Sequence, residues 1–305
     1  MEDLKLVISP SPHVRDTDTT EGIMVAVLIS LIPVLAAAVY FFGFSAIRLV
    51  LLGGATAVAT EAVFQKLRNK PITVWDGSAL VTGVLLALTV PPTLPSWMII
   101  VGSVVAIVIG KQVFGGLGHN IFNPALVGRA FLTASFVGSM TAWTGPFDTI
   151  TRATPLVVGA ARVRLPDLFF GSVAGSLGET SALAILLGGI YLFYRGILDH
   201  RITLGVLSAV IVMSFLTGAN PVYGILSGSV LFGAVFMATD MVTSPYTPRG
   251  RWIFGVGVGL IIMLIRTWGS MPEGVTYAIL LMNAATPLIN RWTRPRIYGQ
   301  GVQRS

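Results

Sequence analysis

Gly77–Thr89 reads GSALVTGVLLALT, and this stretch, which recurs loosely as GSVLFGAVFMAT at Gly228–Thr239, decides the fold. Both copies are apolar, rich in small residues and followed by proline, at Pro91 and at Pro245. Glycine- and proline-interrupted helices at matching positions of two halves are typical of membrane proteins built from inverted repeats. Small residues also let membrane helices pack closely, so close packing remains a second explanation of the pattern.

The composition places these stretches in a membrane protein. The chain has 305 residues, of which 54% are hydrophobic and 11% are charged, and its mean hydropathy is +0.81. Soluble domains carry about 25% charged residues, and this chain lacks the residues to build a charged shell around a soluble core. The net charge of +7 is therefore interpreted as a sign of membrane orientation, and no nucleic-acid binding is expected.

Hydropathy predicts about ten transmembrane helices, and the expected fold class is an all-α, polytopic membrane protein. The two copies of the repeated stretch form the third and the eighth span, so each is the third helix of a five-helix half. Because five is odd, the second half is expected to be inverted relative to the first. The predicted spans are 23–42, 46–65, 77–91, 96–113, 124–140, 179–194, 202–217, 222–241, 252–268 and 274–290.

The basic residues predict an orientation for these helices. With the N-terminus inside, fourteen Lys and Arg residues fall on inner segments and five on outer segments or ends. This positive-inside bias predicts that both termini are cytoplasmic and that the loop 141–178 faces outward. The expected divisions are a cytoplasmic segment 1–22, a first membrane half 23–140, an outer loop 141–178, a second membrane half 179–291 and a cytoplasmic tail 292–305.

The composition also limits the chemistry of the chain. It contains no cysteine, which excludes disulfides, thiolate zinc sites and any iron–sulfur cluster held by its own thiolates. Its histidines, His13, His119 and His200, are too scattered for a haem pair or a metal cluster. We therefore expect no resident metal and no catalytic acid, base or nucleophile. No G-x-G-x-x-G motif follows a strand pattern, so no NAD site is expected.

Two polar stretches lie at predicted helix ends. Asn120 and Asn123 join the fourth and fifth spans, and their amides offer donors and acceptors beside a helix N-terminus. Such a pocket suits a flat heterocycle with imide edges, but a re-entrant turn needs the same residues to satisfy its own backbone. Glu179 and Thr180 follow the outer loop, and the carboxylate is expected in the first turn of the sixth span, where it complements the helix dipole.

A third stretch contains a carboxylate at membrane depth. Asp240 lies at the inner end of the eighth span. Ionisable groups at this depth are costly and are functional candidates, so Asp240 is a candidate for coupling to a cation. The structural alternative is that Asp240 pairs with Arg249 and holds the inner loop.

The longest polar interruption of the sequence contains Asp148–Leu156, DTITRATPL. Three hydroxyl residues and one carboxylate fall within seven positions of the predicted outer loop. Composition alone favours an ordinary solvated loop, because Thr, Asp and Pro are common loop residues.

Taken together, these stretches resemble the family of membrane subunits that contains RnfD of the Rnf complexes and, more distantly, NqrB of the sodium-pumping NADH:quinone reductase. The matching pieces spread over nearly the whole chain, and its length favours the RnfD type. The resemblance implies an electron-carrying subunit of an ion-translocating oxidoreductase, not catalytic alone. Its complex couples ferredoxin:NAD⁺ electron transfer to movement of Na⁺ or H⁺. The pieces are Asp148–Leu156, Asn123–Phe131, Gly178–Ser181 and Thr239–Pro245.

The resemblance also implies a covalent cofactor, FMN, on the outer loop. In this family FMN is joined by a phosphoester bond to the last Thr of an Asp-x-x-Ser/Thr-x-Ala-Thr pattern. That residue is Thr154 here, with Asp148, Thr151 and Ala153 at the other fixed positions. Arg152 stands where the best-known form has Gly, and an Arg beside a phosphodiester is a charge-assisted partner.

The family is further associated with a second, non-covalent flavin, riboflavin, nearer the cytoplasmic side. Asn120 and Asn123 are the candidates to hold it, while Glu179 and Thr180 are candidates near the covalent flavin. The implied partners are other membrane subunits, flavoprotein subunits and the lipid bilayer, and the implied location is the inner membrane of a prokaryotic cell. A different class of function stays open at this point, because inverted halves that meet at two broken helices also describe a small-solute channel or transporter of urea-channel-like architecture.

Overall fold

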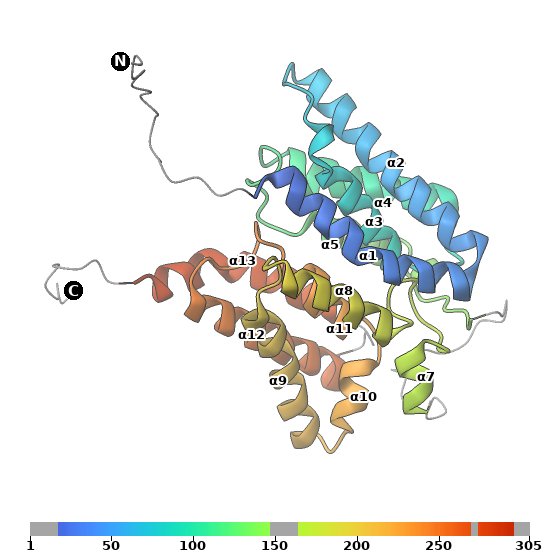
Figure 1. Cartoon of the computed structure of the whole chain (residues 1–305), viewed down its shortest axis with the longest axis vertical. Coiled ribbons are helices and arrows are strands. Elements are labelled where there is room, and N and C mark those ends of the chain that lie inside the picture. The colour runs from blue at the N-terminus through green and yellow to red at the C-terminus, as the bar shows by residue number, and fades with distance from the viewer. Residues whose placement is uncertain (1–17, 147–163, 270–273, 296–305) are drawn as a thin grey trace, which may run out of the picture.

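The computed structural model describes residues 18–146, 164–269 and 274–295 (Figure 1). Within these ranges the chain forms helices joined by short connections and contains no strand, which confirms the predicted all-α fold. The predicted FMN loop, with Asp148, Thr151, Arg152, Ala153 and Thr154, lies outside the described residues.

The first half of the chain begins with its two longest helices and continues with shorter ones. Thr19 caps the first helix by accepting a hydrogen bond from the backbone N–H of Gly22, at 3.1 Å. The elements are α1 (Thr20–Phe42), α2 (Phe44–Leu67), the 3₁₀ turn η1 (Val74–Asp76), α3 (Ser78–Leu88), α4 (Ser96–Ile107) with its π-helical extension η2 (Val108–Gln112), α5 (Pro124–Ser135) and α6 (Val137–Met140).

The second half is more interrupted. Asn220, Thr247 and Ser181 each cap a helix through their side chains. The elements are α7 (Leu165–Phe170), α8 (Ala182–Tyr194), α9 (His200–Leu216), α10 (Pro221–Leu226), α11 (Val230–Phe232), the π-helical segment η3 (Gly233–Met237), α12 (Pro248–Trp268) and α13 (Val275–Thr293).

The repeated stretch forms short helices in both halves. Gly77 and Gly228 both adopt the left-handed conformation, with φ of 76° and 65°, directly before α3 and the segment that contains α11. The eleven residues of α3 rise only about 16 Å, well short of a bilayer core of about 30 Å. In the second half the predicted continuous span 222–241 is wrong, because the chain turns at Gly228 and divides it into α10, α11 and η3.

Three helices of the described residues are long and apolar enough to cross a membrane, namely α1, α2 and α12. Several shorter apolar helices accompany them, α3, α4 with η2, α8 and α9. This combination identifies the chain as a polytopic membrane protein that contains both long helices and shorter, interrupted ones.

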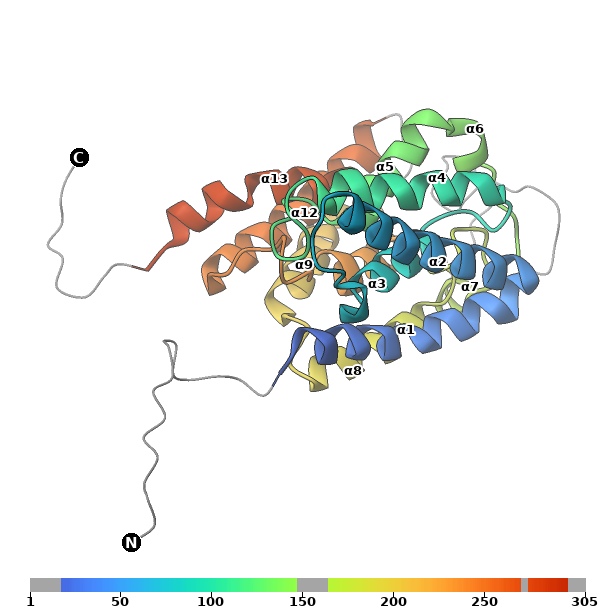
Figure 2. The same cartoon turned by 90° about the horizontal axis from the view of Figure 1, so that it is seen from above.

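Packing partners repeat between the two halves. Helix α2 packs against α3 and α4, as α9 packs against α10 and α12, and α4 packs against α5 as α12 packs against α13. Helices α1 and α8 run beside each other where the halves meet (Figures 1 and 2). This correspondence agrees with a repeat, while the orientation of each half in the membrane stays a prediction.

Glycines bring helix backbones into direct contact in both halves. A Cβ atom on Gly83 of α3 would lie 2.4 Å from the carbonyl oxygen of Gly53 in α2. A Cβ atom on Gly255 of α12 would likewise lie 2.4 Å from the carbonyl oxygen of Ile202 in α9. Membrane helices associate mainly through such close packing, so these contacts fix the positions of the helices around the site described next.

Candidate functional site

A cavity lies between the two halves, at the end of the bundle where α1 begins. Apolar side chains form most of its wall, and α1, α3, α8 and η3 contribute several of them. The space that a water-sized molecule can enter measures about 90 Å³, enough for several waters. The polar residues in the wall are Ser78, Thr82, Lys111, Asn120, Asn123, Thr239 and Asp240.

Asn123 holds the two halves together. Its side-chain Oδ1 caps α5 by accepting from the backbone N–H groups of Ala125 and Leu126, at 3.1 and 3.4 Å. Its Nδ2 donates to the carbonyl of Met237 in η3, and its backbone N–H donates to Oδ1 of Asn283 in α13, at 3.4 and 3.2 Å. Protein groups thus bond to the amide of Asn123 as the structural interpretation of this stretch expects, while its assignment to a flavin stays a prediction.

Asn120 differs from Asn123 in its bonding. Its Nδ2 donates to the carbonyl of Phe122 at 3.2 Å, but its Oδ1 has no hydrogen-bond partner within the described part of the chain. The residue is only 5% exposed and lines the cavity. A buried polar atom without a partner is costly, so an acceptor in this position suits a donor group bound in the cavity.

Asp240 lies in the same wall, just after η3. Its carboxylate accepts from the backbone N–H of Val242 and from the hydroxyl of Thr243, each at 3.2 Å. The alternative pairing with Arg249 is wrong for the described residues, in which Asp240 is held by its own loop. Within those residues the carboxylate therefore faces the cavity without a neutralising cation of its own, and its assignment to cation coupling stays a prediction.

Glu179 and Thr180 lie away from this cavity, at the N-terminal end of α8. The chain here forms a turn, in which the N–H of Glu179 donates to the carbonyl of Ser176 at 3.2 Å. The N–H groups of Leu177 and Gly178 donate to the carbonyls of Val90 and Leu88, at 3.2 and 2.7 Å. A Cβ atom on Gly178 would lie 2.9 Å from that of Leu88. Consequently α8 begins only at Ala182, and the prediction that Glu179 lies in its first turn is wrong.

The carboxylate of Glu179 instead forms a buried ion pair. Its Oε1 lies 3.5 Å from Nη2 of Arg129 in α5, and both side chains are 3% exposed. Thr180 and Ser176 beside them are also buried, and the Ser176 hydroxyl has no partner within the described residues. Arg129 follows Asn123 by six residues, so this polar cluster and the cavity are separated by about 9 Å along α5.

A sequence model of the NQR2, RnfD, RnfE family matches residues 7–299. The chain belongs to the NQR2, RnfD, RnfE family. The family resemblance predicted from the sequence is therefore confirmed.

Individual relatives of this family match the chain from end to end. It is 51% identical to the D subunit of the Na⁺-translocating ferredoxin:NAD⁺ oxidoreductase complex of Acetobacterium woodii, over 98% of this chain and 97% of that protein. It is 41% identical to the D subunit of the proton-translocating complex of Clostridium ljungdahlii, over 96% of each. It is 39% identical to the D subunit of an ion-translocating oxidoreductase complex of Stutzerimonas stutzeri, over 93% of this chain and 94% of that protein.

Sequence reasoning missed two residues near the cavity of this family member. Lys111 was assigned to an inner segment as an orientation signal, and Glu61 within the second span was not considered. The structure buries both, and each is 1% exposed. The available signal was their opposite charge within the second and the fourth predicted spans, since ionisable residues are expensive in a membrane unless they pair.

Proposed function

We propose that this chain is an electron-carrying membrane subunit of a complex that couples ferredoxin:NAD⁺ electron transfer to translocation of Na⁺ or H⁺. The observation that carries the proposal is the end-to-end match to D subunits of such complexes. Membership of this family favours electron transfer over the small-solute channel. The relatives differ in the ion that they move, Na⁺ in one and protons in another, so the match supports no choice between the ions.

Two flavins belong to this proposal. FMN is esterified to Thr154 in the loop Asp148–Leu156, and a non-covalent riboflavin occupies the cavity between the halves. The unpartnered Oδ1 of buried Asn120 supports the second assignment, because the imide N–H of a flavin ring is a donor that fits this acceptor. When bound, a flavin supplies one-electron chemistry, while the protein positions it and excludes water.

The residues of the chain have separate tasks in this function. Asn123 fixes the cavity wall to the second half, and Asn120 presents the acceptor. The buried pair of Arg129 and Glu179 lies between the cavity and the opposite end of the bundle, next to the chain segment that leads from the FMN loop into α8. The surrounding helices shield the cavity and the Arg129–Glu179 pair from water. Other membrane and flavoprotein subunits deliver and remove the electrons.

Intact-mass measurement tests the covalent flavin. Chain purified from a host with the attachment machinery should be heavier by one FMN less one water. Thr154→Val should lose this mass and keep the fold, because Val matches Thr in shape without its hydroxyl. Thr151→Val is the matched control, since it removes a hydroxyl from the same loop, and it should keep the adduct. Loss of the adduct in Thr151→Val with retention in Thr154→Val would contradict the assignment.

The proposal also places both termini and the cavity on the cytoplasmic side. A reporter fused after Arg291 should then read cytoplasmic, and one fused near Gly171 should read outside, on the side of the FMN loop. An inside signal near Gly171 would contradict the proposed placement of the covalent flavin.

A further inference from the structure

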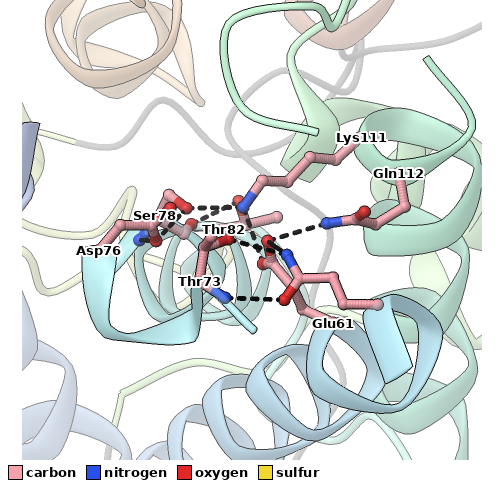
Figure 3. Close-up of polar contacts among 8 residues, drawn as sticks. Glu61, Thr73, Asp76, Ser78, Thr82, Lys111 and Gln112 are labelled. Carbon is pink, nitrogen blue, oxygen red and sulfur yellow. Dashed lines mark hydrogen bonds and ion pairs between the residues drawn. The ribbon is translucent and has the colours of Figure 1, made fainter. Parts of the chain in front are cut away.

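A cluster of buried polar and charged side chains lies directly behind the cavity wall. Nζ of Lys111 in η2 lies 2.7 Å from Oε2 of Glu61 in α2, and both side chains are 1% exposed. The other carboxylate oxygen of Glu61 accepts from Nε2 of Gln112 at 2.8 Å (Figure 3). The same oxygen accepts from Nε2 of Gln65 at 3.2 Å. Three donors therefore surround the carboxylate of Glu61 and fix its position.

Lys111 is held from a second direction by Ser78. The Ser78 hydroxyl accepts from Nζ of Lys111 at 2.6 Å and donates to Oδ1 of Asp76 at 2.5 Å (Figure 3). An ammonium group has three N–H donors, of which Glu61 and Ser78 occupy two. Lys111 and Ser78 line the cavity, whereas Glu61 stands behind them and does not. The positive end of the ion pair is therefore the end that meets the cavity.

This arrangement is expensive for a purely structural role. Ions buried at membrane depth lose their hydration, and a buried ion pair adds little stability compared with apolar residues of similar volume. The Glu61–Lys111 pair also receives more hydrogen bonds than it needs for neutralisation alone. The hydrogen bonds from Gln65, Gln112 and Ser78 hold the Lys111 ammonium in place at the cavity wall. The same wall contains the unpartnered acceptor of Asn120.

We propose that Lys111 recognises the electron-accepting edge of the flavin in this cavity and raises its reduction potential, with Glu61 as the residue that positions Lys111. This inference rests on the proposed function. A flavin ring carries carbonyl acceptors on either side of an imide donor, and the wall offers the complementary pair, the donor Lys111 and the acceptor Asn120. A fixed cation beside a ring that gains negative charge favours the reduced form.

The partial neutralisation of Lys111 by Glu61 limits the expected effect. With a charge separation of a few ångströms and an effective dielectric constant of about 20, the ion pair should favour the reduced form roughly tenfold. A tenfold change in a one-electron equilibrium corresponds to about 59 mV. Asp240, a carboxylate in the same wall, should act in the opposite direction.

The test uses the full-length chain in detergent with Thr154→Val as background, so that only the non-covalent flavin remains. Lys111→Gln combined with Glu61→Gln removes both charges and keeps hydrogen-bonding amides in their places. Redox titration of the flavin absorbance should show a potential lower by about 59 mV, a tenfold shift. Asp240→Asn should raise the potential. Both variants should elute from gel filtration like the parent chain.

Arg48→Gln is the matched control. It removes a cation of α2 that donates to the carbonyl of Leu94 and does not line the cavity, so it should leave the potential unchanged. An unchanged potential in the Lys111→Gln, Glu61→Gln double variant would overturn the role of Lys111, and so would an equal shift or equal flavin loss in Arg48→Gln. If the Thr154→Val parent releases no riboflavin on denaturation, the proposed second flavin itself is wrong, which is a separate outcome.

Discussion

The two halves of the molecule place a cation at corresponding positions and use it differently. Lys111 follows α4 in the first half, and Arg266 lies in the last turn of α12 in the second. Lys111 contacts a carboxylate and a hydroxyl at the cavity. Arg266 donates to the backbone carbonyls of Gly224 and Ser227, at 2.9 and 3.0 Å, where α10 ends.

The difference follows from the break in the second half. A helix that ends inside a protein leaves carbonyl groups without intrahelical partners, and the planar fork of an Arg satisfies two of them at once. In the first half the matching glycine, Gly77, is preceded only by the three-residue turn η1 and not by a six-residue helix such as α10. There the cation bonds to side chains instead of backbone carbonyls. One half thus uses its cation to close a helix end, and the other presents it to a cavity.

The largest expected loss of stability comes from removing one partner of the Glu61–Lys111 ion pair in the first half. Glu61→Ala leaves the buried Lys111 ammonium without its carboxylate and should destabilise the chain by about 3–5 kcal/mol, the usual cost of an uncompensated buried charge. Thermal unfolding of the chain in detergent, followed by gel filtration after heating, measures the loss. Glu61→Gln, which keeps a hydrogen-bonding side chain, should lose less. A Glu61→Ala chain as stable as the wild type would show that Lys111 does not depend on Glu61.

The helices could be predicted from the sequence, but this pair could not. Hydropathy and length predicted the all-α fold, and the repeated stretch predicted interrupted helices at matching positions. The left-handed conformation of Gly77 and Gly228 is seen only in the structure. Pairing depends on which side chains meet after folding, and Glu61 and Lys111 are 50 positions apart. A count of basic residues by segment treats every Lys alike, so it could not separate a buried Lys from an interfacial one.

The candidate site shows the same limit. The asparagines were predicted as a group, because polar amides beside a helix N-terminus are visible in the sequence. Which of them is occupied by protein groups depends on partners far along the chain, such as Asn283, which lies 160 positions from Asn123. Glu179 was misplaced for a similar reason, since its helix start is delayed by hydrogen bonds to the end of α3 and the residues after it, and not by any local signal.

An intermediate loss of stability is expected when Arg266, the cation of the second half, is replaced. Arg266→Met keeps the apolar stem but removes both hydrogen bonds to the end of α10, and a loss of about 2 kcal/mol should follow. Arg48→Met is the matched control, because Arg48 makes one such bond, to the carbonyl of Leu94 at 3.2 Å, and should cost about half as much. Thermal unfolding in detergent compares the stability losses of the two variants. Equal losses would mean that the break between α10 and α11 does not depend on Arg266.

The smallest changes in stability are expected at Ser78 and Ser229, the two serines that follow the left-handed glycines. Ser78→Ala removes the hydroxyl that joins Lys111 to Asp76 and should cost about 1–2 kcal/mol, because a buried donor loses its acceptor. Ser229 occupies the matching position, directly after Gly228, and its buried hydroxyl has no partner within the described ranges.

Ser229→Ala should therefore change stability by less than about 0.5 kcal/mol, since removing an unpartnered buried hydroxyl relieves its desolvation cost and forfeits no bond. The two substitutions remove the same atom from the same position of the two halves, so the difference between their melting temperatures isolates the contribution of the cation-bound network. A loss in Ser229→Ala as large as that in Ser78→Ala would show that the second half also depends on a polar contact of its serine hydroxyl. The proposed difference between Lys111, which meets the cavity, and Arg266, which bonds to backbone carbonyls, would then not hold.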